Sequence, residues 1–269
     1  MIERVIVAID VGNTNVRLGI VQGGDVISSR SAPARPEATI DELGATLDKM
    51  LRDVGASLDD ADEIVMASVV PAVTRTVREV ARRRGISLLV AGEETIPMAI
   101  RVDHPQAVGD DRLINAFAAA RLYGSPAIVV DMGTATTFDV VAADGAFIGG
   151  AIAPGVRLGL EALAERAAQL PHVPLVMPPR AIAKDTVSAM QSGALIGHLG
   201  LIEELVRAIR DELALDGDSA PKVILTGGLS TFDWVAAIPG VDAIDPLLTL
   251  RGLALLQAEV GKLHSVPAT

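Results

Sequence analysis

Two apolar segments, far apart in the chain, end in the same way. Residues 6–12 read IVAIDVG, and residues 127–133 read AIVVDMG. Short, continuously apolar runs of this kind are typical of buried strands. The aspartate and the glycine that follow each run predict that both strands stop in a polar turn.

The similarity between the two regions continues beyond these turns. A shift of 121 residues brings Asp10 onto Asp131 and Gly24 onto Gly145. In both copies the turn leads into a second apolar segment, a glycine-containing hairpin signal and a third segment. The expected second strands cover residues 16–21 and 137–142, and the expected third strands cover residues 26–31 and 146–151. The sequence therefore predicts two copies of a three-stranded meander.

Helices and strands alternate after each meander. Helical spacing of apolar residues predicts helices at 39–54, 73–84, 155–169, 186–215 and 229–237, with a further helix at 111–123 between the halves. Short apolar runs predict strands at 63–68, 87–90 and 222–225. This alternation is typical of mainly parallel sheets covered by helices, so we expect an α/β protein. We expect one domain at residues 1–110 and a second at 111–269, with a connecting segment near 101–108 and a frayed tail at 264–269.

Composition narrows the class of protein. The 269 residues are half apolar but include only four Phe, one Tyr and one Trp, so the cores must be aliphatic. The net charge of −11 argues against a nucleic-acid partner. The absence of cysteine excludes disulfides and thiolate metal sites. No apolar run approaches the roughly 18 residues of a membrane span, and the start does not resemble a signal peptide, so we expect a cytoplasmic protein without a membrane partner.

The paired turns suggest a phosphate site. If the two halves meet at the ends of their first strands, Asp10 and Asp131 face one cleft, and a cation between them relieves their repulsion. Mg²⁺ bound to ATP phosphates is a natural candidate, because it is held by one or two carboxylates, water and phosphate oxygens. Small polar residues follow both aspartates, namely Gly12, Asn13, Thr14, Asn15, Thr134, Thr136 and Thr137. No Walker motif is present, so the chain does not predict P-loop chemistry.

A third glycine-containing turn lies near the end of the chain. Residues 223–230 read VILTGGLS, a strand followed by Thr, two glycines and the expected start of a helix. Gly227 and Gly228 carry no side chains and can accept a flat ring or a phosphate, and Ser230 could cap the helix. We predict that the two glycines contact the adenosine of ATP.

These motifs, taken in order, resemble a known family. DVGNT, GDDR at 109–112, DMGTATT, GGAIAPG at 149–155, DTVSAMQSG at 185–193 and TGGLS are similar to the motifs of type III pantothenate kinases. The resemblance spans nearly the whole chain. It implies duplicated ribonuclease-H-like domains, as in actin, hexokinase and Hsp70. It also implies ATP-dependent phosphorylation of pantothenate, the first step of coenzyme A synthesis, by a homodimer that uses Mg²⁺ and a monovalent cation, K⁺ or NH₄⁺.

The resemblance also implies roles for individual residues. The ATP phosphate segment becomes Asp10, Val11, Gly12, Asn13, Thr14, Asn15, Val16 and Arg17, with Thr134 as a further ATP contact. The substrate loop becomes Gly109, Asp110, Asp111 and Arg112. Within it Asp111 is the proton acceptor, while Asp131 binds the monovalent cation. Thr186 contacts pantothenate across the dimer interface, and Asp10 holds Mg²⁺ through phosphate or water.

Three positions depart from the family pattern, all near the expected acceptor site. Val102 stands where a tyrosine is usual, Asp110 where alanine is usual, and Asp185 where asparagine is common. Asp110 is expected to raise the pKa of Asp111 and to oppose an anionic substrate. These changes leave open a kinase of the same fold for another small hydroxyl compound. A non-catalytic nucleotide-binding regulator is a further alternative, although it would be expected to lose Asp111 and Thr186. A phosphatase would need a separate water-positioning acid, for which the sequence offers no candidate.

Overall fold

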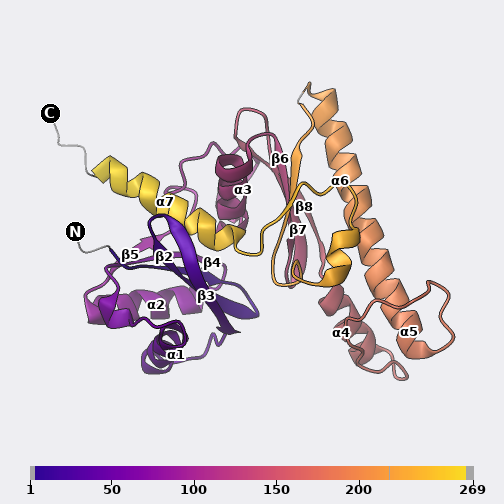
Figure 1. Ribbon diagram of the computed structural model, residues 1–269, viewed down its shortest axis with the longest axis horizontal. Helices are drawn as coiled ribbons and strands as arrows, with labels where there is room; N and C mark the ends of the chain where they lie inside the picture. Colours follow the sequence, from indigo (N-terminus) through magenta and orange to yellow (C-terminus); the bar gives the residue numbers. More distant parts are fainter. Residues whose placement is uncertain (1–3, 218, 265–269) are drawn as a thin grey trace. The chain divides into compact units, whose positions relative to one another are not determined.

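The computed structural model describes residues 4–217 and 219–264, and the chain forms two compact units. The first unit comprises Met1–Leu122 and Leu247–Thr269, and the second comprises Tyr123–Pro246 (Figure 1). Each unit is built around one five-stranded sheet.

The sheet of the first unit has the order β3-β2-β1-β4-β5. Its strands are β1 (Ile6–Val11), β2 (Asn15–Gln22), β3 (Asp25–Pro33), β4 (Glu63–Ser68) and β5 (Ser87–Val90). β1 pairs antiparallel with β2 and parallel with β4. The hairpin between β2 and β3 turns at Gly23 and Gly24, both with positive φ, which confirms the predicted hairpin.

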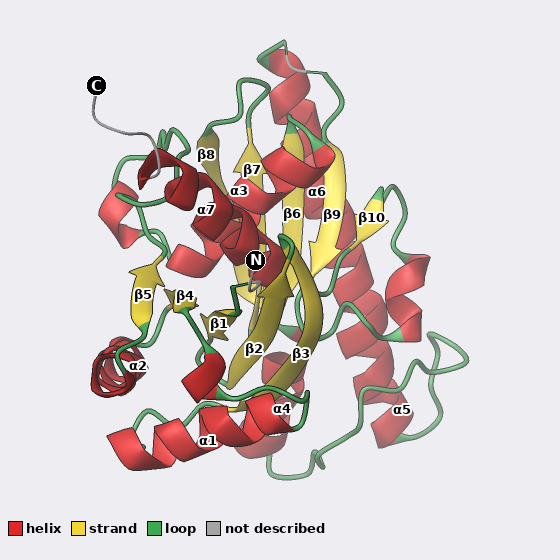
Figure 2. Ribbon diagram, turned by 60° about the vertical axis from the view of Figure 1, so that its left-hand side comes forward, coloured by secondary structure: helices red, strands yellow, loops and turns green. Residues whose placement is uncertain are grey.

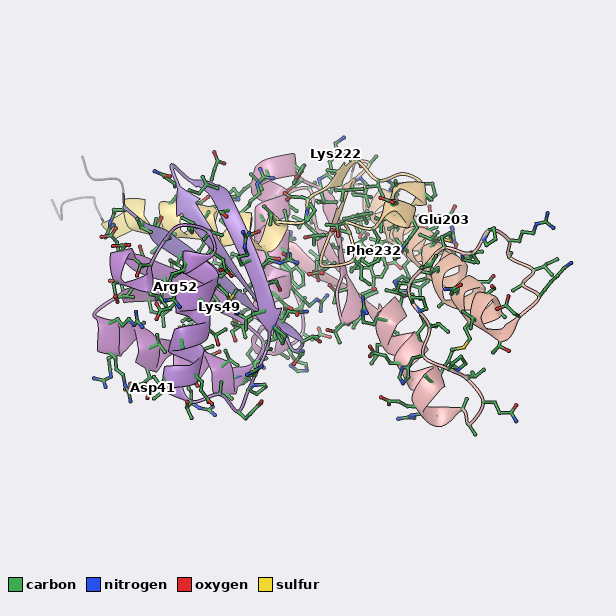
Figure 3. The ribbon with its side chains drawn as sticks, turned by 60° about the horizontal axis from the view of Figure 1, so that its bottom comes forward. Asp41, Lys49, Arg52, Glu203, Lys222 and Phe232 are labelled. Atoms are coloured by element: carbon green, nitrogen blue, oxygen red, sulfur yellow. The ribbon has the colours of Figure 1, made fainter. Side chains whose placement is uncertain are left out.

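Two helices cover one face of this sheet. α1 (Ile40–Arg52) begins with a capping box between Thr39 and Glu42, and α2 (Pro71–Arg84) begins with proline and ends at Gly85 in the left-handed conformation. The surface of α1 carries Asp41 in its first turn and Lys49 and Arg52 in its last, an order that complements the helix dipole (Figure 3).

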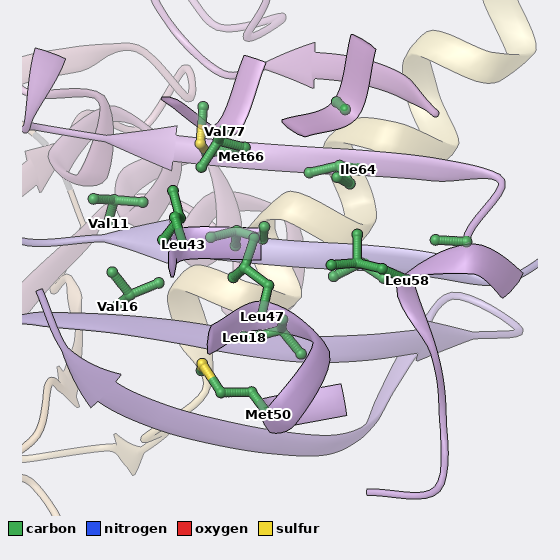
Figure 4. Packing of buried hydrophobic residues seen from close by; sticks show 14 of the residues in the cluster. Val11, Val16, Leu18, Leu43, Leu47, Met50, Leu58, Ile64, Met66 and Val77 are labelled. Atoms are coloured by element: carbon green, nitrogen blue, oxygen red, sulfur yellow. The ribbon is translucent and has the colours of Figure 1, made fainter. Parts of the chain in front are cut away.

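The core on this face is aliphatic, as the composition predicted. Figure 4 shows Leu43, Leu47 and Met50 of α1 packed over the strands of the sheet. Alternate residues of β1 contribute to this core, namely Val7, Ile9 and Val11. Because strand residues alternate between faces, Ala8 and Asp10 point to the other face.

The other face of this sheet is covered by α7 (Leu248–His264), which the sequence analysis did not predict. Leu250 of α7 lies against Gly19, the cross-strand partner of Ala8, so α7 is on the face of Asp10. α7 also packs on α3 (Asp110–Tyr123), closely enough that a side chain at position 252 would approach the carbonyl of Ile114 within 2.8 Å.

The second sheet has the order β10-β9-β6-β7-β8. Its strands are β6 (Ala127–Met132), β7 (Ala135–Val141), β8 (Phe147–Pro154), β9 (Lys222–Thr226) and β10 (Ala243–Ile244). Figure 2 shows β6 between β7 and β9. Read from the other edge, the order β8-β7-β6-β9-β10 matches that of the first sheet strand for strand, so the predicted duplication of the meander is confirmed.

A long helical segment packs on this second sheet. It consists of α5 (Thr186–Gln191), a π-helical turn at Ser192–Ile196 and α6 (Gly197–Leu215), as the prediction for 186–215 required. Leu195, Ile202 and Val206 join the core beneath it, and Met190 is also buried. α4 (Val156–Arg166) is shorter than the predicted 155–169.

The predicted helix at 229–237 is wrong. Residues 227–231 form turns, and only Asp233–Ala237 are helical, as a 3-10 helix. Thr231, Phe232 and Val235 have weak helix propensity, and Pro239 follows closely, so a short segment does not nucleate an α-helix here.

The contact units do not follow the predicted boundary at residue 110. Residues 111–122 and the C-terminal helix α7 group with the first sheet, as do residues 101–108, which were expected to connect the domains. The domain boundary at residue 110 stays a prediction, because a division into compact units does not show where one copy of the duplicated segment ends and the next begins. In the part of the chain described, no helix is long and apolar enough to cross a membrane. Of the predicted frayed tail, His264 ends α7 and residues 265–269 lie outside the described residues.

Candidate functional site

The first group of predicted site residues lies where β1 turns into β2. Asp10 is partly buried, points to the face opposite the aliphatic core, and stands across from Arg17 on β2. The backbone N–H of Gly12 donates to the carbonyl of Asn15 at 2.9 Å, and that of Ala34 donates to the carbonyl of Thr14 at 2.8 Å. These bonds hold a tight turn in place, from which small polar side chains emerge.

Three short polar side chains of this turn are exposed, those of Asn13, Thr14 and Asn15. Val16 is buried directly after them and fixes the start of β2 in the core. The turn therefore combines a rigid base with accessible hydrogen-bonding groups, an arrangement that suits binding of phosphate oxygens.

The predicted substrate loop lies at the N-terminus of α3. The Oδ1 atom of Asp111 accepts a hydrogen bond from the backbone N–H of Arg112 at 2.8 Å. Gly109 precedes it, and a β-carbon there would lie 2.5 Å from the same Oδ1 atom. A glycine is therefore needed for the Asp111 carboxylate to occupy this position.

Val69 connects these two groups within the first unit. Its backbone N–H donates to the carbonyl of Val11 at 3.0 Å, at the end of β1. Its Cγ1 atom lies 3.3 Å from the position of a β-carbon on Gly109. The structure thus brings the predicted phosphate turn and the predicted acceptor loop to either side of one residue.

Burial changes the acidity of both aspartates in this loop. Burial raises the pKa of Asp111, and the hydrogen bond from Arg112 and its charge oppose that rise. Burial, followed by the charge of Asp111, raises the pKa of Asp110 to about 6. The pKa of Asp111 is therefore raised, as predicted, but the cause is burial and not Asp110. The charge effect between the two acts on Asp110 instead. A raised pKa brings a carboxylate closer to the range in which it can accept a proton at neutral pH.

The second unit presents the matching strand end. Asp131 stands on β6, and its neighbours Val130 and Met132 point into the core of this unit, so Asp131 points to the opposite face. The following turn is closed by a hydrogen bond of 3.0 Å from the N–H of Gly133 to the carbonyl of Ala135. Thr134 at the tip of this turn is exposed.

Two glycines pack directly against this turn. A β-carbon on Gly155 would lie 2.3 Å from the carbonyl oxygen of Thr134, and one on Gly227 would lie 2.3 Å from Oδ1 of Asp131. Gly227 also has φ of +90°, which L-residues with side chains rarely adopt. Ser230 donates to the carbonyl of Gly227 at 2.7 Å and so closes this turn, rather than capping a helix.

The remaining predicted residues are spread over the surface of the two units. Thr186 is exposed as the first residue of α5, and Asp185 caps that helix through Ser188, whose hydrogen bonds lower the pKa of the Asp185 carboxyl. The departure at Asp185 therefore preserves a helix cap. Val102 lies in a loop and is partly buried.

The structure therefore brings together two separate groups of predicted residues. Asp10, the turn after it and the 109–112 loop belong to the first unit, and Asp131, Thr134 and the glycines at 227 and 228 belong to the second. That Asp10 and Asp131 face each other stays a prediction. Gly155 was missed as an individual residue, although it ends the GGAIAPG motif.

Comparison with known proteins identifies the family. A sequence model of the family described as type III pantothenate kinase matches residues 6–208. The type III pantothenate kinase of Thermomicrobium roseum is 45% identical over 251 residues, covering 92% of this chain and 95% of the relative. That of Moorella thermoacetica is 41% identical, covering 93% and 98%. This chain belongs to the type III pantothenate kinase family.

Solved structures support the fold of this family member at low sequence identity. MreB 5 of Spiroplasma citri, solved with AMPPNP, has a TM-score of 0.56 at 11% identity, covering 97% of this chain and 98% of that one. The ROK hexokinase of Thermus thermophilus has a TM-score of 0.51 at 14% identity, covering 96% and 99%. The actin-like fold that the family resemblance implied is confirmed.

Proposed function

We infer that the chain transfers the γ-phosphoryl group of ATP to the primary hydroxyl of pantothenate, giving 4′-phosphopantothenate, the first step of coenzyme A biosynthesis. The observation that carries this inference, beyond family membership, is the position of Asp111. It is a partly buried carboxylate of raised pKa at the start of a helix, beside Val69, which adjoins the phosphate turn. A proton acceptor and a phosphate-binding turn are the two elements that this reaction needs.

The nucleotide side of the site is assigned to both strand-end turns. The segment from Asp10 to Arg17 binds the phosphates through the exposed groups of its turn, and Thr134 provides a further contact. Gly227 and Gly228 offer a surface without side chains to the adenosine. Phosphoryl transfer has a loose transition state, so positioning and charge neutralisation by these groups contribute most of the catalysis.

We assign Mg²⁺ as an ion that arrives with the nucleotide. Mg²⁺ keeps several waters and is held through one or two carboxylates and the phosphates. Asp10 is the carboxylate assigned to it, and the ion would supply charge neutralisation to the phosphates.

The acceptor side is assigned to the loop at 109–112. Asp111 orients the hydroxyl of pantothenate and takes its proton late in the reaction. Arg112 pairs with the carboxylate of pantothenate through its guanidinium. Thr186 is a further pantothenate contact, contributed by the partner subunit in a dimer. Asp110 and Val102 are tolerated variations in this assignment.

The monovalent cation is assigned to Asp131. A carboxylate is a hard oxygen ligand that suits K⁺, and it can also accept hydrogen bonds from NH₄⁺. Asp131 is partly buried at a strand end, and Gly227 packs against one of its oxygens, which restricts the carboxylate to few orientations.

We also assign a homodimer that works in the cytoplasm, where ATP is available. Several large apolar side chains of the second unit are exposed on β8, on α4, on α5 and in the loop before α5. They are Ile152, Leu158, Leu163, Val176, Ile182 and Val187. Exposed apolar groups in this number mark interaction surfaces. Light scattering on the purified protein tests this state, and Ile182→Glu should weaken the dimer.

The activity is tested by coupled ADP release. Purified protein is assayed with ATP and Mg²⁺, with and without pantothenate, in K⁺ and then in Na⁺ buffer. The proposal predicts release that requires pantothenate and rises with K⁺. ATP binding without pantothenate-dependent release would assign the site to another hydroxyl compound or to a regulatory role.

A further inference from the structure

One buried hydroxyl near Asp131 is not explained by the fold. Thr226 ends β9 and is 1% exposed, and its Oγ1 atom has no hydrogen-bond partner. Along with Trp234 Nε1, it is one of two such atoms among the residues that the structure describes. A buried hydroxyl that gives up water without gaining a partner is destabilising, and such groups in folded proteins call for an explanation such as a bound ion.

The position of this hydroxyl relates it to the Asp131 carboxylate. β9 runs parallel to β6, and Thr226 is in register with Asp131. Residues in register on adjacent strands point to the same face of a sheet, so both side chains lie on the face opposite the core that contains Val130 and Leu225. The next residue, Gly227, lies so close to Asp131 that a β-carbon added to it would clash with the Oδ1 atom of Asp131. The threonine and the aspartate are therefore neighbours, yet no hydrogen bond from Oγ1 joins them.

The equivalent position in the first unit shows that the fold does not need a hydroxyl here. Asp10 corresponds to Asp131, and the residue in register with Asp10 on the parallel strand β4 is Ala67. Ala67 is also fully buried. A buried methyl group therefore suffices where the strand pairing is the same, and the hydroxyl of Thr226 serves something other than packing.

We propose that Thr226 Oγ1 is a ligand of the monovalent cation at Asp131. A hydroxyl and a carboxylate from adjacent strands provide two oxygen donors on one face, which is the chemistry that alkali cations prefer. This inference rests on the proposed cation at Asp131 and adds the residue that makes the second unit, and not the first, selective for that ion. Thr226 is a binding residue in this account and takes no part in proton transfer.

The test is thermal unfolding of the full chain during a titration with KCl, with choline chloride holding the ionic strength constant. Wild type, Thr226→Val, Thr226→Ser and the control Thr76→Val are compared. The hydroxyl of Thr76 donates to the carbonyl of Ala72 in α2 at 3.1 Å. Thr76→Val therefore makes the same chemical change in the first unit, away from Asp131. We expect K⁺ to raise the Tm of wild type, Thr226→Ser and the control alike.

Thr226→Val should be no less stable than wild type without K⁺, but should bind K⁺ more weakly. Without K⁺ its Tm should equal or exceed that of wild type, because an unpartnered hydroxyl has been removed. The K⁺ concentration for half-maximal stabilisation should rise about tenfold. If this variant does not fold, Thr226→Ala, which copies the residue at position 67, gives the same comparison.

An unchanged K⁺ response in Thr226→Val would overturn the assignment. If stabilisation by ATP were also weaker in this variant, the hydroxyl of Thr226 would be assigned to nucleotide binding instead. If K⁺ did not change the Tm of wild type, both the assignment of the cation to Asp131 and the role of Thr226 would be wrong. Pantothenate-dependent ADP release would still support the kinase in that case, so the two failures are distinguishable.

Discussion

The two sheets of this protein share one design and differ at the strand beside each aspartate. In both, a central strand ends in aspartate, is paired with an antiparallel meander on one side and is flanked by a parallel strand on the other. Even the faces agree, since Asp10 and Asp131 both point away from the core that their neighbours fill. The fold thus fixes where the carboxylate stands in each unit.

The differences lie in the residues around that carboxylate. The turn after Asp10 has three residues between strands, and the turn after Asp131 has two. On the parallel strand, Ala67 of the first unit corresponds to Thr226 of the second. β4 continues to Ser68, whereas β9 ends at Thr226 and Gly227 follows in the turn. The comparison teaches that the shared strand sets the position of the carboxylate, and we propose that the neighbouring residues determine what each carboxylate binds.

The largest expected effect tests whether the acceptor loop of the first unit acts in catalysis and not in nucleotide binding. Asp111→Asn removes the proposed proton acceptor while keeping the shape of the side chain, so kcat should fall about 10²- to 10⁴-fold. The Kd for ATP, measured by calorimetry, should stay within about twofold of wild type. An equal loss of ATP binding would make Asp111 a metal or phosphate residue and would break the division of roles between the turn and the loop.

The next effect tests the difference between Ser68 and Gly227. Gly227→Ala places a β-carbon against Asp131 and Met132 in a left-handed backbone, so the free energy of unfolding should fall by about 3 kcal/mol or more. Ser68→Ala loses only the hydrogen bonds of Ser68 with Thr74 and Val70, which should cost about 1 kcal/mol. Similar losses for the two variants in urea unfolding would contradict the packing described here.

A pH-dependent cost to stability is expected at the start of α3 in the first unit. The pKa of Asp110 is about 6 in the folded chain, above its ordinary value of 3.8. The folded state therefore holds a proton that the unfolded chain has released, and stability falls as the pH rises from about 4 to about 6. Above that range Asp110→Asn should be more stable than wild type by about 1 kcal/mol, a figure reduced for the partial exposure of the side chain.

Urea unfolding at pH 4 and at pH 8 measures this effect. The gain from Asp110→Asn should be present at pH 8 and absent at pH 4. Asp103→Asn, at an exposed position in the same unit, controls for the loss of one negative charge. A gain of equal size at both pH values would show that the Asp110 carboxylate is not disfavoured by its surroundings.

The smallest effect concerns the helix that carries Thr186 in the second unit. Asp185→Ala should lower the Tm slightly, because the bond to the N–H of Ser188 is lost, whereas Asp185→Asn should keep the cap and the Tm at pH 7. Neither change should alter kcat. A change in KM for pantothenate with Asp185→Asn would instead make this departure from the family pattern a determinant of substrate binding.

The strands were predictable because their signals are local. The aspartates at the ends of β1 and β6 were identified from apolar runs and turns within a few residues of each other. The helix α7 was missed because it is buried between a sheet and α3, with Leu250, Leu253 and Leu256 all fully covered, so the usual amphipathic contrast is weak. The prediction of a helix at 229–237 was wrong for the opposite reason. An apolar pattern was present, but the segment has neither the length nor the propensity to form a helix.

The site was predictable only where motifs are contiguous in sequence. The importance of Thr226 and Gly155 depends on strands that meet only in the fold, since Thr226 lies about 95 residues from its partner Asp131. Similarly, the contact of Val69 with both the Val11 carbonyl and the Gly109 loop could not be read from spacing. Long-range register, rather than composition, defines these parts of the site.

The most direct test of the account is a K⁺ titration of pantothenate-dependent ADP release in Asp10→Asn and Asp131→Asn. We predict that Asp131→Asn raises the K⁺ requirement at unchanged Mg²⁺ requirement, and that Asp10→Asn raises the Mg²⁺ requirement at unchanged K⁺ requirement. Identical cation profiles for the two variants would contradict the claim that equivalent carboxylates in the two units bind different ions.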